Sequence, residues 1–342
     1  MSEKLLEVKN LRVSYHTYAG EVQSVRGVSF TVNKGETVAV VGESGCGKSV
    51  TAKSIMRLIK TPPAEIKEGS EILFDGEDVL QFNEKRLCAY RGGEVAMVFQ
   101  DALAALNPTM TVGNQIMENL RHHTKLSKKE AKARAVELLR MVGIPQPESR
   151  VDQYPHEFSG GMRQRVMIAI AFACDPKLLI ADEPTTALDV TIQAQIIDLI
   201  KALQKEKNAS VILITHDLGV VANIADRIVV MYAGQIVERG TSMEVFHHPR
   251  HPYTNALLEA VPRLDLQNKQ QLASIEGTPP DLIAPPKGCP FCTRCKYCME
   301  ICCEQQPPVL NFGDGHEAGC WLYKLETPAA DAPFTQEAHY EG

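Results

Sequence analysis

The segment that most constrains the fold is a run of eight residues, Gly42–Ser49, which reads GESGCGKS. It fits the pattern G-x-x-x-x-G-K-[ST] in full, and we call it the phosphate loop. A short apolar run, 36–41, precedes it and predicts a strand, whereas Ser49–Ile59 shows the apolar spacing of a helix. A strand, a glycine-rich loop and a helix in this order predict a nucleotide-binding α/β fold with a mostly parallel sheet.

The residue types in the phosphate loop suit a nucleotide triphosphate. Six residues would turn backbone N–H groups toward phosphate oxygens: Gly42, Glu43, Ser44, Gly45, Cys46 and Gly47. The helix that follows directs its positive end at the same anion. Lys48 would add a cation at the β- and γ-phosphates, and the Ser49 hydroxyl would bind Mg²⁺.

Two further apolar runs end in polar residues that complete a hydrolytic site. Leu178–Ala181 is followed by Asp182 and Glu183, and an acidic residue at the carboxyl edge of a parallel strand faces the ligand crevice. We expect Asp182 to hold Mg²⁺ through water and Glu183 to orient and polarise the attacking water. His216 follows the apolar run 211–215 and could hydrogen-bond the γ-phosphate.

The other patterned segments alternate between strands and helices. Apolar and polar residues alternate over Leu5–Val13 and Val22–Val32, as in paired strands, and Asp75-Gly76 indicates a hairpin turn. Further segments have the pattern of strands or helices: a strand at 95–99, a helical stretch at 111–142, and helices at 163–174 and 190–205. This order predicts helices on both faces of the parallel sheet.

The segment Phe158–Arg165, FSGGMRQR, resembles the LSGGQ signature of ATP-binding cassette (ABC) ATPases, with departures at Phe158 and Met162. The resemblance spans about residues 5–250. It implies that ATP contacts come from the signature and D-loop residues Ser159, Gly160, Gly161 and Asp189. It also implies that Gln100 touches Mg²⁺ and couples to a membrane partner, that His216 is the switch histidine, and that Tyr15 stacks on adenine, with Tyr18 as its rival.

The same resemblance implies an architecture and a mechanism. The fold would be a RecA-like core with an antiparallel β subdomain and a helical subdomain at about 102–165, all within an ATPase domain of residues 1–250. Two subunits would clamp two ATP molecules head to tail, each site pairing one chain's phosphate loop with the other chain's signature. The catalytic residues would be Glu183, His216 and Gln100, and Mg²⁺ would be held by Ser49, Gln100 and Asp182.

The region beyond the ATPase domain narrows the resemblance. Residues 248–262, HPRHPYTNALLEAVP, look like the region that follows the ATPase core in oligopeptide and dipeptide importers. This implies a subunit that powers peptide uptake, with nickel, glutathione or another small solute as the alternative cargo. The implied partners are a second, different ATPase chain, two transmembrane permeases and an extracytoplasmic peptide-binding protein.

Seven of the ten cysteines lie between Cys289 and Cys320, within a Cys-rich extension at 251–325. In a reducing cytosol, such a cluster indicates metal ligands before disulfides. The importer resemblance implies a [4Fe-4S] cluster on Cys289, Cys295, Cys302 and Cys320. Thiolate chemistry leaves alternatives: zinc, no metal, or a ferredoxin-like run that uses Cys292 and Cys298, with Cys303 also extra. We expect the small, polar tail at 326–342 to be disordered.

Charge and hydropathy exclude other classes. The formal net charge of −6 and the lack of Lys/Arg clusters around the cysteines disfavour nucleic-acid binding. No apolar stretch is long enough to span a bilayer, so we expect a peripheral protein on the cytoplasmic face of the cell membrane and not a fused exporter. Too few residues separate Gln100 from Ser159 for the long coiled coil of DNA-repair relatives, and ribosome-acting relatives carry two cassettes.

Overall fold

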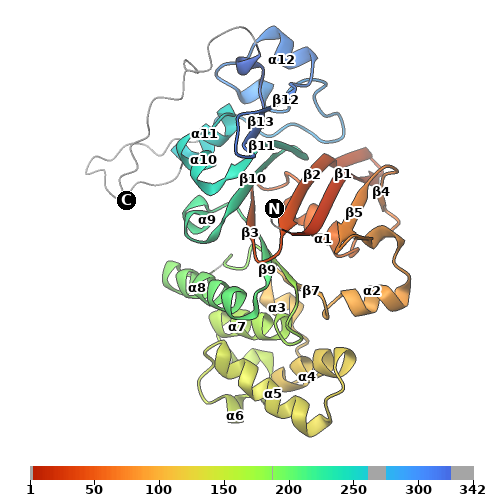
Figure 1. The fold of residues 1–342 in the computed structure, drawn as a ribbon, viewed down its shortest axis with the longest axis vertical. Helices are drawn as coiled ribbons and strands as arrows, with labels where there is room; N and C mark the ends of the chain where they lie inside the picture. Colours follow the sequence, from red (N-terminus) through yellow and green to blue (C-terminus); the bar gives the residue numbers. More distant parts are fainter. Residues whose placement is uncertain (1–2, 187, 261–274, 325–342) are drawn as a thin grey trace, which may run out of the picture. The chain divides into compact units, whose positions relative to one another are not determined.

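A computed structural model describes residues 3–186, 188–260 and 275–324 (Figure 1). The chain divides into two units. The first consists of Met1–Leu6, Val32–Thr37 and Phe74–Ile214, and the second of Glu7–Thr31, Val38–Leu73 and Thr215–Gly342. The phosphate loop belongs to the second unit, whereas Asp182 and the signature segment belong to the first. The predicted tail at 326–342 lies outside the described residues.

The second unit contains an antiparallel β sheet. Strands β2 (Gly20–Asn33), β1 (Lys4–Thr17) and β5 (Glu71–Phe74) lie in that order, and β4 (Ala64–Ile66) pairs antiparallel with β1. The alternating pattern therefore predicted strands correctly. The turn to β6 (Glu77–Asp78) also follows its prediction, because Asp75 and Gly76 have φ of +48° and +84°, as a two-residue hairpin turn requires.

A second sheet in this unit carries the phosphate loop. Its order is β12 (Val309–Asn311), β13 (Glu317–Gly319), β11 (Gln235–Thr241), β10 (Arg227–Tyr232) and β3 (Thr37–Val41). β3 runs parallel to β10 and is buried along its whole length, as a strand covered on both faces should be. The sequence did not predict β12 and β13, which pair antiparallel and extend the sheet beyond β11.

Short helices complete the second unit: α1 (Lys48–Ile55), α9 (Leu218–Ile224), α10 (Ser242–His247), α11 (Pro252–Glu259), α12 (Glu300–Glu304), and the 3₁₀ turns η3 (Cys292–Arg294) and η4 (Trp321–Tyr323). α1 ends earlier than the predicted Ile59. Arg57 has φ of +49°, its N–H donates to Ser54 O, and the N–H of Leu58 donates to Lys53 O. These two bonds form a Schellman motif, which terminates the helix.

The first unit contains the parallel strands β9 (Ser210–Thr215), β8 (Leu178–Asp182) and β7 (Val95–Val98), in that order. Every residue of the three strands is buried. The same unit contains the short helices η1 (Val79–Gln81) and α2 (Glu84–Tyr90), and the long helix α8 (Val190–Lys207). Their positions agree with the strand and helix predictions to within two residues.

A group of helices lies between β7 and β8 in the sequence: α3 (Ala102–Ala105), α4 (Val112–His123), α5 (Lys128–Met141), α6 (Pro147–Arg150), η2 (Pro155–Glu157) and α7 (Gly160–Ala171). The predicted helical stretch at 111–142 is two helices instead of one. Ser127 accepts the N–H of Glu130, whose carboxylate accepts the N–H of Ser127. This capping box starts a new helix and so breaks the stretch.

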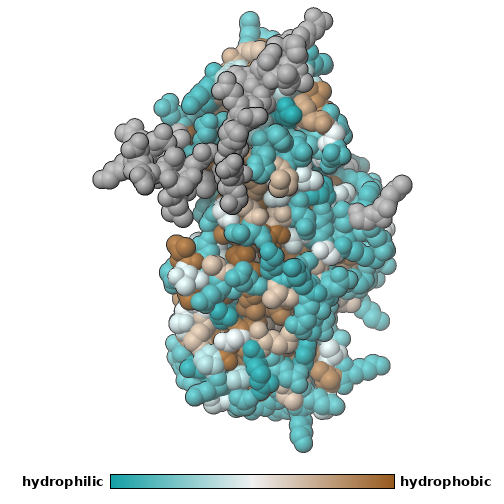
Figure 2. Space-filling model, turned by 60° about the vertical axis from the view of Figure 1, so that its left-hand side comes forward, coloured by the Kyte–Doolittle hydropathy of each residue, from teal (hydrophilic) through white to brown (hydrophobic). Residues whose placement is uncertain are grey.

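None of the described helices is long and apolar enough to cross a membrane. Figure 2 shows a face on which hydrophilic residues predominate, with apolar residues gathered in its middle part. The exposed large apolar side chains include Phe99, Leu103 and Tyr154 in the first unit.

Candidate functional site

The backbone of the phosphate loop requires glycine at two positions. Gly42 and Gly47 have φ of +150° and +99°, a region that other residues rarely adopt. A Cβ atom on Gly42 would lie 2.1 Å from the carbonyl oxygen of Met231, and one on Gly47 would lie 2.4 Å from that of Ser24. The glycines therefore allow the loop to fold closely against the neighbouring backbone.

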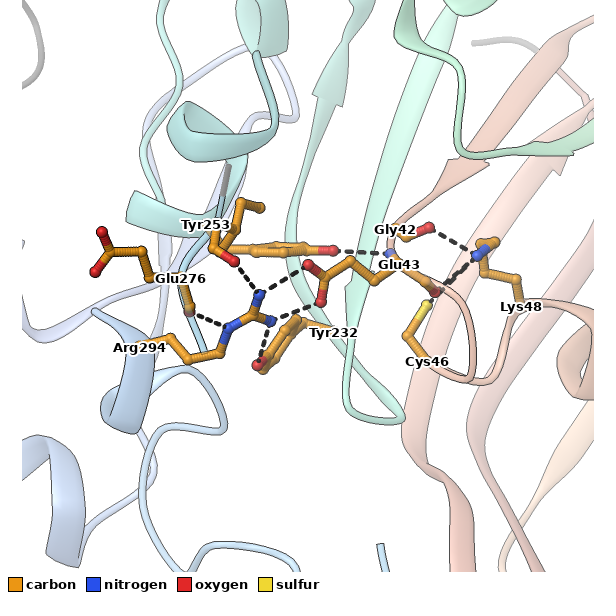
Figure 3. Close-up of polar contacts among 9 residues, drawn as sticks. Gly42, Glu43, Cys46, Lys48, Tyr232, Tyr253, Glu276 and Arg294 are labelled. Atoms are coloured by element: carbon orange, nitrogen blue, oxygen red, sulfur yellow. Dashed lines mark hydrogen bonds and ion pairs between the residues drawn. The ribbon is translucent and has the colours of Figure 1, made fainter. Parts of the chain in front are cut away.

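Lys48 begins α1 and closes the loop. Its Nζ donates to the carbonyl oxygens of Gly42 and Glu43 over 2.7 and 2.9 Å, and the residue is buried (Figure 3). Gly47 occupies the N-cap position, where it offers no side chain to the N–H groups of the first turn. A cation next to a helix N-terminus is an environment suited to an anion. Cys46 is buried within the same loop, and burial raises the pKa of its thiol.

Glu43 is held by residues that sequence reasoning missed. Its backbone N–H donates to the hydroxyl of Tyr253 over 2.9 Å. Its carboxylate accepts two hydrogen bonds from Arg294, at 2.6 and 3.0 Å (Figure 3). Neither residue lies in a recognisable motif, and Arg294 stands 251 positions away in the sequence.

The acidic pair lies at the carboxyl end of β8 in the first unit. Asp182 is buried at the last position of the strand. Glu183 follows with φ of +47°, and its N–H donates to the carbonyl of Ile214. Left-handed backbone at a residue other than glycine is a strained conformation that gathers at functional sites. Oε2 of Glu183 accepts hydrogen bonds from Gln100 Nε2 at 3.1 Å and from Thr186 Oγ1 at 2.9 Å.

The signature segment lies at the start of α7, also in the first unit. Ser159 is exposed and caps the helix, since its Oγ accepts the N–H of Met162. Gly161 sits close to α8, where a Cβ atom would lie 2.9 Å from a methyl group of Ile192. Asp189 caps α8 by accepting the N–H of Ile192 over 2.9 Å. The signature and Asp189 therefore meet at one residue.

The remaining predicted ATP contacts belong to the second unit. His216 is exposed directly after β9. Tyr15 is partly buried on β1, and burial raises the pKa of its hydroxyl. Tyr18 is fully exposed in the turn after β1. Among the candidates, the structure brings Gln100 to Glu183 in the first unit and joins Lys48 to Gly42 and Glu43 in the second.

Four of the extension's seven cysteines form one electrostatic group. Burial, and after it the nearness of the other thiols in this group, raises the pKa of Cys289 and Cys320 to about 12. Cys295 and Cys302 complete the group, and the pKa of Cys295 is raised by burial and by Cys302. The N–H of Cys289 also donates to the carbonyl of Cys302 over 2.7 Å. These four thiols are therefore neighbours.

The other three cysteines form a separate contact. Sγ of Cys298 lies 3.8 Å from Sγ of Cys303, and both residues are exposed. Burial, and after it Cys303, raises the pKa of the Cys292 thiol. No group of three or more His, Cys, Asp or Glu side chains within the described ranges is arranged to hold a single metal ion.

Comparison with known proteins places these motifs in a family. A family model described as "ABC transporter" matches residues 25–186. The oligopeptide transport ATP-binding protein OppD of Bacillus subtilis is 59% identical over 96% of this chain and 92% of its own length. The chain belongs to the ABC transporter family. It is also 55% identical to the B. subtilis dipeptide transport ATP-binding protein DppD, over 94% of this chain and 95% of that one.

Two further matches describe the ABC fold and the extension. A model named "Oligopeptide/dipeptide transporter, C-terminal region" matches residues 237–302. A post-hydrolysis dimer of the ATP-binding cassette MJ0796, bound to ADP and Pi, superposes with a TM-score of 0.62. That match has 28% identity and covers 69% of this chain and 98% of the other. The chain therefore has the ABC cassette fold and is an ATPase, for which ATP and Mg²⁺ are the expected ligands.

Proposed function

We propose that this chain hydrolyses ATP to power the import of dipeptides or oligopeptides through a membrane ABC transporter. The observation that carries the proposal is the 59% identity to a peptide transport ATP-binding protein over nearly the whole of both chains. The match at residues 237–302 to the C-terminal region of such transporters supports the same cargo.

ATP binds at the phosphate loop in this proposal. Gly42, Gly45 and Gly47 have positive φ and leave room for the backbone to surround phosphate oxygens. Lys48 exchanges its carbonyl partners for the β- and γ-phosphates. Six further residues complete the site: Ser49 binds Mg²⁺ together with Gln100 and Asp182, Tyr15 stacks on adenine, and Asp189 and His216 act near the γ-phosphate.

Glu183 orients the attacking water in this proposal. Two donors, the Gln100 amide and the Thr186 hydroxyl, fix one of its carboxylate oxygens. The other oxygen is then directed at water, which it polarises as it attacks the γ-phosphate. Gln100 touches this carboxylate and would carry the state of the site to the membrane partner.

The proposal includes a nucleotide-dependent pair of ATPase chains. Ser159 and Gly160 are exposed at the start of α7, where a helix N-terminus can face a γ-phosphate presented by another chain. The solved relative is itself described as a dimer. The partners are a second, different ATPase, two permease subunits and an extracytoplasmic peptide-binding protein, so the chain works at the cytoplasmic face of the membrane.

The proposed domains are an ATPase domain at 1–250 and a Cys-rich extension at 251–325. Within the first, the antiparallel strands form the β subdomain and residues 102–165 form the helical subdomain that transmits motion to the permeases. Phe99, Leu103 and Tyr154 support this role, because exposed apolar side chains suit a docking surface.

The four neighbouring cysteines suit a [4Fe-4S] cluster. Such a cluster spreads its four thiolates over four irons, whereas zinc draws its ligands to one point. The described side chains offer no single-ion site, which weighs against zinc. Burial keeps Cys289 and Cys320 protonated, so a cationic cluster is needed to hold them as thiolates. When bound, the cluster would brace the extension through Cys289, Cys295, Cys302 and Cys320.

Uptake in cells tests the cargo. A strain that lacks this chain is complemented with wild type or with Glu183→Gln, and uptake of a labelled dipeptide and a labelled pentapeptide is measured. We expect wild type alone to restore uptake, and the peptide that recovers gives the size class. If deletion leaves both peptides unaffected, peptide cargo is wrong, and nickel, glutathione and other small solutes are tested next.

A further inference from the structure

The phosphate loop carries an acidic side chain, which is an unusual group to place beside a triphosphate. Glu43 is the second residue of the loop, and its carboxylate is one-quarter exposed. A negative charge next to an anionic ligand opposes binding unless a cation neutralises it and keeps it aside. The residue that does so here is Arg294, from the Cys-rich extension (Figure 3).

The guanidinium of Arg294 uses all five of its N–H donors. Nη1 donates to Glu43 Oε2 at 2.6 Å and to the Tyr232 hydroxyl at 3.1 Å. Nη2 donates to Glu43 Oε1 at 3.0 Å and to the carbonyl of Ile275 at 3.0 Å. Nε donates to the carbonyl of Glu276 at 2.9 Å. A guanidinium has five donors in a fixed plane, so this arrangement leaves it one position.

The surroundings make this contact selective and strong. The side chain of Arg294 is 4% exposed, and its guanidinium lies over the rings of Tyr232 and Phe291. The hydrogen bonds to Glu43 raise the pKa of Arg294, so the guanidinium stays charged. A two-pronged arginine–carboxylate pair is directional as well as charged, and lysine cannot reproduce it.

The backbone of Glu43 is held by the same group of aromatic residues. Its N–H donates to the hydroxyl of Tyr253, whose ring lies 4.5 Å from Tyr232 and 5.3 Å from Phe291 between centroids. Phe291 and Arg294 both come from the extension, next to Cys292 and Cys295. The extension therefore fixes both the side chain and the main chain of one phosphate-loop residue.

From this arrangement we infer that Arg294 is a positioning residue of the ATP site, which neutralises Glu43 and holds it away from the triphosphate. The inference rests on the proposed function, because it takes the phosphate loop as the place where ATP binds. It makes the Cys-rich extension a working part of the nucleotide site. Arg294 does not touch ATP and acts through Glu43.

The test measures binding of a fluorescent ATP analogue to the purified full-length chain and its variants. Arg294→Gln should weaken binding about tenfold, as expected for an uncompensated like charge beside the ligand. KM for ATP should rise by a similar factor while kcat changes little. Adding Glu43→Gln to Arg294→Gln should restore most of the affinity, because the charge that opposes binding is gone.

The control is Arg239→Gln, which breaks another arginine–glutamate contact of the extension. Arg239 Nη2 lies 2.6 Å from Glu317 Oε2. This variant should bind ATP as wild type does. Unchanged affinity in Arg294→Gln, or a loss that Glu43→Gln fails to restore, would overturn the inference. A wild-type chain that does not bind ATP would instead refute the proposed function.

If Arg294→Gln does not fold, Arg294→Lys replaces it, because lysine keeps the charge but loses the two-pronged contact. The lysine variant should fold and bind ATP about threefold more weakly, since only one carboxylate oxygen stays held. Wild-type affinity in Arg294→Lys would show that the fixed position of Glu43 is unimportant.

Discussion

The side-chain amide of Gln100 donates a hydrogen bond to Oε2 of Glu183 over 3.1 Å, across 83 positions of the sequence. Because Thr186 donates to the same oxygen, the carboxylate is fixed before it meets water. A fixed carboxylate suits a base that must keep one direction during attack.

Glu183→Gln should bind ATP normally and lose turnover by about 100-fold or more, since an amide cannot take a proton from water. Phosphate release measures the rate, and size-exclusion chromatography with ATP should show an accumulated dimer. Thr186→Ala is a matched variant, because it removes one donor and keeps the carboxylate. Near-normal phosphate release from Glu183→Gln would contradict the assignment.

Lys48→Ala should abolish ATP binding or hydrolysis. The residue is buried, and its Nζ is bonded to the carbonyls of Gly42 and Glu43, so its removal takes away the loop's own cation. Lys53→Ala removes an exposed lysine from the same helix and should leave ATP binding unchanged. Equal affinity and rate in Lys48→Ala and wild type would refute the phosphate-loop assignment.

The two groups of cysteines predict which substitutions cost iron. Protein purified without oxygen should be brown and contain about four irons per chain. Serine at Cys289, Cys295, Cys302 or Cys320 should remove the colour. Serine at Cys292, Cys298 or Cys303 should keep it, because these thiols form the other group. Colourless wild-type protein with stoichiometric zinc would contradict the iron–sulfur assignment.

His251 predicts a loss of stability in acid. Burial lowers the pKa of this histidine to about 3, while the unfolded chain titrates near 6.5. As the pH falls from 6.5 toward 3, the unfolded state therefore binds a proton that the folded state refuses. The free energy of unfolding should fall by up to about 1.4 kcal/mol per pH unit from this group.

His251→Asn isolates that contribution. The histidine Nδ1 accepts the N–H of Tyr253 at the start of α11, and asparagine can cap a helix in the same way without titrating. Denaturant unfolding of both proteins at pH 7 and pH 5 measures the difference. Parallel losses in wild type and variant would show that His251 does not titrate on unfolding.

The phosphate loop and the strands around it could be predicted because each depends on neighbouring residues. Glycine spacing sets the loop, and apolar runs set β3 and β8. The break before α5 was also readable, since Ser127 and Glu130 form a capping box. The roles assigned to His216 and Tyr15 stay predictions, because the exposure of each side chain does not assign it a ligand.

Other features could not be predicted because their partners are distant. β12 and β13 are three residues each, and their pairing with β11 places them rather than local propensity. Arg294 reads as an ordinary residue between two cysteines, and only the fold brings it to Glu43. Tyr253 is equally silent in the sequence.

The distance between Glu43 and Arg294 along the chain also orders events during synthesis. A ribosome adds about 5 to 20 residues per second, so the 251 positions that separate them take roughly 13 to 50 s to make. The loop leaves the ribosome early, but its acidic residue stays without its cation until the cysteine-rich segment follows. A chain that stops short of that segment, whether nascent or truncated, has the full nucleotide motif and still lacks the contact that sets it.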